Sequence, residues 1–160
     1  MVKSLVAVLN RCTGCRLCEL ACAYRRYKSI NPSRARIHVV RLDHEPVDAP
    51  MFCAQCGLCI GACPLNAIKR DLKTGAIIVD EEKCTGCGQC VHVCPYGVAT
   101  IDPASKKASI CDLCGGEPEC VRICPENALI YVDSEKAAVY KRLTFSRLQR
   151  KELTPYAPYP

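Results

Sequence analysis

Apolar residues along the chain come in short runs, separated by polar and turn-forming residues. Pairs of runs with turn residues between them are typical of β-hairpins. They predict three hairpins: 67–70 with 76–79, 98–101 with 107–110, and 128–132 with 137–140. The opening run at 4–9 is expected to pair with the third of these.

Apolar segments at 17–23, 60–62 and 91–93 predict helices of only a few residues. After residue 140 basic side chains alternate with Leu143, Phe145 and Leu148, which predicts one more short helix before an extended, Pro- and Tyr-rich end. The pattern therefore indicates an α+β fold of short helices and hairpins. We expect one domain over residues 1–140 and a basic docking segment over 141–160 with an extended C-terminal arm.

Cysteine is the residue that changes this picture, with 16 in 160 residues and no tryptophan. The cysteines form four blocks of four, which is an internal repeat. The blocks are Cys12, Cys15, Cys18 and Cys22; Cys53, Cys56, Cys59 and Cys63; Cys84, Cys87, Cys90 and Cys94; and Cys111, Cys114, Cys120 and Cys124. The first three read C-x2-C-x2-C-x3-C, and the fourth has three extra residues in its middle loop.

This spacing is that of the bacterial ferredoxin run that binds cubane [4Fe-4S] clusters. The first three cysteines of a block can hold three corners of one cubane, while the fourth begins a helix that leads away to a different cluster. The blocks must therefore work in pairs, each lending its last cysteine to the other. Glycines between the ligands, such as Gly14 and Gly86, let the backbone turn sharply near a cluster.

Two other uses of the cysteines fit the sequence less well. Zinc ribbons carry two C-x2-4-C knuckles separated by a longer loop, whereas each block here places four thiols within a single short loop. Disulfides need an oxidising compartment and would have to bridge crowded neighbours. The sequence therefore favours iron as the metal bound by all sixteen cysteines.

From residue 1 to about 140 the chain resembles four-cluster, ferredoxin-type electron-transfer subunits. The runs that carry the resemblance are CTGCRLCELAC at 12–22, CAQCGLCIGACP at 53–64, CTGCGQCVHVCP at 84–95, and the fourth block with its closing Cys124-Pro125. In that family the first block pairs with the fourth and the second with the third, as two interleaved dicluster units. The resemblance thus implies four ligand sets: Cys12, Cys15, Cys18 with Cys124; Cys111, Cys114, Cys120 with Cys22; Cys53, Cys56, Cys59 with Cys94; and Cys84, Cys87, Cys90 with Cys63.

The resemblance implies a chain of four [4Fe-4S] clusters that transfers electrons within a hetero-oligomer. One partner would be a large catalytic tungsten or molybdenum pterin subunit, and the other a further redox protein or flavin subunit. The chain is most similar to the small subunits of aldehyde oxidoreductase-type tungstoenzymes, including their benzoyl-CoA-reducing relatives. A subunit of a formate dehydrogenase, hydrogenase or carbon monoxide dehydrogenase complex, and a free polyferredoxin, remain alternatives. We expect no substrate chemistry of its own, because the sequence offers no nucleophile, general base or phosphate loop.

The formal charge of +6 counts every cysteine as a neutral thiol. Sixteen thiolates and four oxidised clusters with 2+ cores would bring the net charge to about −2. The basic residues are therefore expected to balance clusters and a docking surface, and no nucleic-acid partner is expected. With no apolar run long enough for a leader or a membrane span, a cytoplasmic location is expected.

Overall fold

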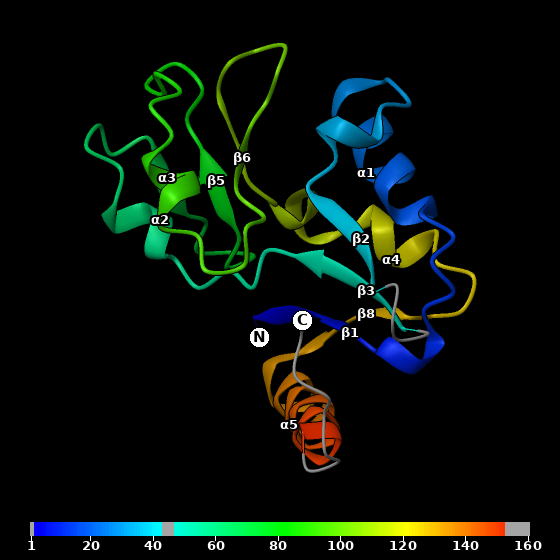
Figure 1. Ribbon diagram of the computed structural model, residues 1–160. Coiled ribbons are helices and arrows are strands. Elements are labelled where there is room, and N and C mark those ends of the chain that lie inside the picture. Colours follow the sequence, from blue (N-terminus) through cyan, green and yellow to red (C-terminus); the bar gives the residue numbers. More distant parts are fainter. Residues whose placement is uncertain (1, 43–46, 153–160) are drawn as a thin grey trace, which may run out of the picture.

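The structure, a computed structural model, describes residues 2–42 and 47–152. Its strands pair as four two-stranded antiparallel sheets, and short helices lie between them. Figure 1 shows two groups of elements side by side. We call residues 53–110 the inserted module and residues 2–52 with 111–133 the framing module.

The framing module is closed by chain segments from both ends of the sequence. β1 (Lys3–Ala7) pairs with β8 (Leu129–Asp133), and β2 (Ile37–Leu42) pairs with β3 (Val47–Phe52). Its helices are η1 (Leu9–Arg11), α1 (Leu17–Tyr27), η2 (Pro32–Arg34), η3 (Leu113–Gly116) and α4 (Glu119–Arg122).

The inserted module repeats one helix-and-hairpin unit. α2 (Leu58–Gly61) precedes the β4 (Ile68–Arg70) and β5 (Ile77–Val79) hairpin, and α3 (Gln89–His92) precedes the β6 (Thr100–Ile101) and β7 (Ala108–Ser109) hairpin. These are the first two hairpins that the sequence predicts, so both are confirmed. The predicted α+β class of interleaved dicluster units is confirmed as well.

Each module has its own small hydrophobic core, and cysteines belong to both. In the inserted module Ile68, Ile77 and Ile110 pack with Cys59, Cys84 and Cys90. In the framing module Leu5, Ile37, Leu113 and Leu129 pack with Cys18 and Cys120. Because so few large apolar side chains are buried, cluster binding is expected to contribute much of the folding free energy.

The predicted third hairpin, 128–132 with 137–140, is wrong. Residues 134–140 begin the helix α5 (Ser134–Glu152), which packs beside the β1–β8 sheet (Figure 1). β8 pairs with β1, so the predicted pairing of the opening run with residues 128–132 is confirmed. Residues 134–140 are then not needed as a strand partner and form a helix, which their alanines favour. Ala137 is buried at this contact. The helix expected after residue 140 is therefore the continuation of a longer one.

The sequence does not predict the β2–β3 hairpin, because Pro50 lies within the second strand. A two-stranded sheet consists of edge strands only, and an edge strand tolerates proline where its N–H position faces away from the partner. The extended arm expected at 153–160 lies outside the described residues. Within residues 2–42 and 47–152, no helix is both long and apolar enough to cross a membrane.

Candidate iron–sulfur centres

Four separate cavities each have four cysteines in their walls. We name them A to D in the chain order of the first cysteine in each cavity. Cavity A holds Cys12, Cys15, Cys18 and Cys124; cavity B holds Cys22, Cys111, Cys114 and Cys120; cavity C holds Cys53, Cys56, Cys59 and Cys94; cavity D holds Cys63, Cys84, Cys87 and Cys90. In every cavity three cysteines come from one block and the fourth comes from another.

The spacing of these thiols fits a multi-iron group better than a single ion. In the part of the chain that the structure describes, no three His, Cys, Asp or Glu side chains come close enough together to hold one metal ion. A tetrahedral zinc site would need four sulfurs within bonding distance of one atom. Four thiols spaced around one cavity suit a cubane, whose irons lie apart at its corners.

Left-handed backbone just before the second cysteine turns each ligand loop around its cavity. Gly14 and Gly86 have φ of +69° and +73° at this position, and Gln55 and Leu113 have +57° and +53°. At Gly86 a side chain is excluded twice, because an added Cβ would lie 2.0 Å from the carbonyl oxygen of Lys106. The expectation that glycine permits these turns is confirmed at both glycines.

Backbone N–H groups reach several of the ligand sulfurs. Ala67 and Ala128 donate to the Sγ atoms of Cys63 and Cys124, both at 3.3 Å and both from four residues later in the chain. Ala108, Gln55 and Arg36 donate in the same way to Cys84, Cys53 and Cys22. Such bonds favour thiolate over thiol and make a reduced cluster easier to form.

Burial works in the opposite direction and raises the pKa of eight of the sixteen thiols. It raises the pKa of Cys18 to about 12, with the charge of Glu19 adding to the effect, and it also raises the pKa of Cys111 to about 12. At Cys94 burial is outweighed by backbone N–H groups, Ala99 foremost, so the pKa falls. Bare thiolates are therefore unfavourable in most of the cavities, and the positive charge of iron would be needed to keep them ionised.

Arg36 lines cavity B, and no pattern in the sequence distinguishes it from the other arginines. Only 5% of it is exposed. Its guanidinium donates to Asp112 at 2.9 Å and to Ser109 at 3.2 Å. A buried arginine at the wall of a cavity lined by four thiols supplies fixed positive charge there, because arginine stays protonated in proteins.

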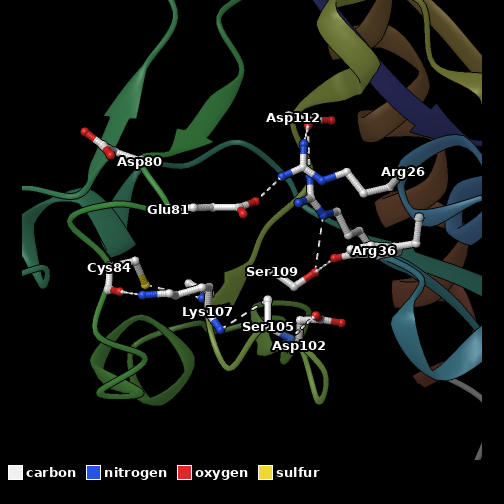
Figure 2. A network of polar contacts seen from close by, with 12 residues as sticks. Arg26, Arg36, Asp80, Glu81, Cys84, Asp102, Ser105, Lys107, Ser109 and Asp112 are labelled. Atoms are coloured by element: carbon white, nitrogen blue, oxygen red, sulfur yellow. Dashed lines mark hydrogen bonds and ion pairs between the residues drawn. The ribbon is translucent and has the colours of Figure 1, made fainter.

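A polar network joins the two modules (Figure 2). The guanidinium groups of Arg26 and Arg36 converge on Asp112, and Arg26 also pairs with Glu81 of the inserted module at 2.5 Å. Asp112 therefore belongs to this joint.

Two other polar residues beside the cysteines take no part in the joint. Glu19 is buried and accepts a hydrogen bond from the N–H of Val39. His92 is exposed.

A second link between the modules is Gln55, one residue before Cys56. Its side-chain Nε2 donates to the carbonyl oxygen of Cys111 at 2.8 Å, and its Oε1 accepts from the N–H of Ile77 at 2.7 Å. Sequence reasoning missed it, although one signal was present: blocks one and three have glycine at this position, and blocks two and four do not.

The cysteine blocks match known families of iron–sulfur domains. Residues 52–98 and residues 76–125 each match a family described as 4Fe-4S dicluster domain, and residues 9–25 match a 4Fe-4S binding domain. The polyferredoxin-like subunit of an aliphatic sulfonate oxidoreductase from Pyrococcus furiosus is 43% identical over 143 residues, covering 86% of this chain and 81% of that protein. The chain belongs to the ferredoxin-type electron-transfer subunits. The presence of several [4Fe-4S] clusters follows from the same matches and from the cysteine spacing.

Further relatives of this ferredoxin-type subunit carry electron-transport names. The putative electron transport protein YsaA of Escherichia coli is 36% identical, over 85% of this chain and 93% of that protein. Electron transport protein HydN of E. coli is 33% identical, over 85% and 91%. Among solved structures, a chain of the active site complex BamBC of benzoyl coenzyme A reductase aligns with a TM-score of 0.50 and 26% identity, over 91% of both chains.

Proposed function

We propose that this chain carries single electrons along four [4Fe-4S] clusters, one in each of cavities A to D. The observation that carries the proposal is the set of four cavities, each lined by four cysteines of which three come from one block and one from another. A bound [4Fe-4S] cluster accepts or gives one electron at a time. The ligand sets are those that the family resemblance implies, and the cysteines around each cavity support them.

The cavities follow one another in the order D, C, B, A. Cys59 of cavity C and Cys90 of cavity D pack in the core of the inserted module, and Cys18 of cavity A and Cys120 of cavity B pack in the framing core. Gln55 bridges cavity C to Cys111 of cavity B. Cavities A and D are then the two ends of the row. Each has one exposed cysteine, Cys15 and Cys87, as cavity C also has in Cys56.

The protein side chains set the conditions for this transfer. The backbone N–H groups stabilise ligand sulfurs, and Arg36 places fixed positive charge at cavity B, which favours the more negative, reduced state there. Arg26 and Arg36 connect the modules, because Arg26 pairs with Glu81 and Arg36 donates to Ser109 of the inserted module. No group in this arrangement needs to bind or transform a substrate.

We further propose that the partner at one end is a catalytic subunit of the tungsten or molybdenum pterin class, with the aldehyde oxidoreductase type favoured, and that a redox protein or flavin subunit serves the other end in the cytoplasm. The Pyrococcus furiosus relative is named as an oxidoreductase subunit, and the structural relative belongs to a reductase complex, which supports a hetero-oligomer. Residues 141–160 are proposed to dock on a partner. The apolar side chains of Val139, Tyr140 and Leu143 are exposed along α5 and support docking.

Anaerobic purification at native abundance tests this assignment. We expect a large subunit containing tungsten or molybdenum to co-elute, and a chain ending at residue 140 to lose that subunit while keeping its iron. A full-length chain that elutes alone and takes electrons from diffusible donors would overturn the subunit proposal and favour a free polyferredoxin.

A further inference from the structure

The four cysteine loops have the same left-handed backbone turn, but two of them have glycine at that position and two have a residue with a side chain. At the residue before the second cysteine, the end cavities A and D have Gly14 and Gly86, whereas the central cavities B and C have Leu113 and Gln55. All four residues have left-handed φ. Leucine and glutamine are strained in that region and glycine is not. The central loops therefore carry a side chain at a position where glycine would avoid backbone strain.

The end loops leave no room for a side chain at this position. A Cβ on Gly14 would lie 2.5 Å from the Asp48 carboxylate, and one on Gly86 would lie 2.0 Å from the backbone of Lys106. In the central loops the side chain instead fills the joint between the modules. Leu113 is 1% exposed in the framing core, and Leu113 and Gln55 line one cavity at this joint.

Gln55 makes hydrogen bonds to a ligand of each central cavity. Its N–H donates to the Sγ of Cys53 in cavity C at 3.4 Å, and its Nε2 donates to the carbonyl oxygen of Cys111 in cavity B at 2.8 Å. The N–H of Ile77 donates to its Oε1 at 2.7 Å, which fixes the orientation of the amide. A continuous path of covalent and hydrogen bonds therefore runs from Cys53 through one side chain to Cys111.

We propose that Gln55 is the positioning residue for electron transfer between the two modules. It holds cavities B and C at one separation and supplies the bonded path between them. The step it serves moves one electron from one central cavity to the other, with no bond formed or broken and no proton moved. This inference rests on the proposed function, because it requires a cluster in both cavities.

The variant Gln55→Gly isolates the side chain. Glycine takes φ of +57° without strain and keeps the backbone N–H that reaches Cys53, so cluster loading and midpoint potentials are expected to stay near wild type. Gln89→Ala is the matched control, since Gln89 is an exposed glutamine directly before Cys90 of cavity D. Both variants are purified anaerobically with the wild-type chain and assayed for iron.

Two measurements decide. One is the rate of electron equilibration after pulse reduction, and the other is spin–spin coupling in the EPR spectrum of the fully reduced protein. We expect Gln55→Gly to slow equilibration several-fold and to weaken coupling, with potentials unchanged and with Gln89→Ala like wild type. A fully loaded Gln55→Gly chain with wild-type rate and coupling overturns the inference. A merely structural role would change stability or loading and leave the rate in loaded molecules unaltered.

If Gln55→Gly loses iron, Gln55→Met decides, because methionine keeps the length of the side chain but not its hydrogen bonds. A loaded Gln55→Met chain with slowed transfer supports the inference. Loss of iron in both variants overturns it, since Gln55 would then be needed for cluster binding. Failure of the proposed function looks different: the wild-type chain itself would hold fewer than four clusters or show no coupling.

Discussion

At the scale of single residues, the fourth cysteine of a block lies in a cavity with three cysteines of another block. Cys124 lines cavity A with Cys12, Cys15 and Cys18, whereas Cys120, four residues earlier, lines cavity B. The crossing arises because α4 separates the two thiols and directs them to different cavities. Neighbours in the sequence thus serve different centres.

This crossing makes a sharp prediction for Cys124→Ser. Iron content should fall by about four per chain, the complement of one cubane. Native alkylation followed by mass mapping should then label Cys12, Cys15 and Cys18, because their centre has lost a ligand.

Cys120→Ser is the matched control for that experiment. It should instead expose Cys22, Cys111 and Cys114 to alkylation. Labelling of Cys111 and Cys114 in the Cys124→Ser chain would contradict the crossed assignment.

The four cysteine blocks could be recognised at this scale because spacing within a block is a local property of the sequence. Gln55 and Arg36 could not, since their roles depend on Cys111 and Asp112, which are distant in the sequence. Nothing local distinguishes a buried arginine between two modules from the many exposed ones.

At the scale of elements, local turns explain which strands could be predicted. In the β4–β5 hairpin the Asp71 carboxylate accepts from the N–H groups of Lys73 and Thr74, so the turn is specified by its own residues. β1 and β8 pair across almost the whole chain, and this closure leaves residues 134–140 free to become helix. The sequence predicts this pairing of the two ends, but not that it replaces the local partner 137–140.

One contact between elements predicts a pH dependence. Arg34 of η2 donates two hydrogen bonds, at 2.6 and 2.8 Å, to the buried Asp102 in the β6–β7 turn. The bonds from Arg34 hold the pKa of Asp102 far below its usual value of about 3.9. The pair therefore contributes stability above that value, and the contribution is lost as pH falls through it towards the folded-state pKa.

Asp102→Asn should accordingly bleach its clusters at a lower temperature than wild type at pH 7. The difference should shrink as pH falls below about 4, where the wild-type carboxylate begins to lose its advantage. Glu82→Gln, which removes one exposed carboxylate, should match wild type throughout. A difference that stays constant with pH would mean that the Arg34 pair is not its source.

At the scale of the whole molecule, the chain has two small hydrophobic cores in place of one large core, and cysteines belong to both. The modules meet through three arginines of the framing module, which reach Glu81, Ser109 and Asp102, and through Gln55 of the inserted module. The family resemblance implied this interleaving, but the residues at the joint emerge only when both modules are folded together. The row of cavities is thus a property of the assembled chain.

Iron and acid-labile sulfide analysis of the anaerobically purified chain tests the central claim most directly. Four cubanes with four cysteine ligands each predict about sixteen iron and about sixteen sulfide per chain. A count near eight of each would remove two of the four centres and contradict the account, and zinc in place of iron would contradict it entirely.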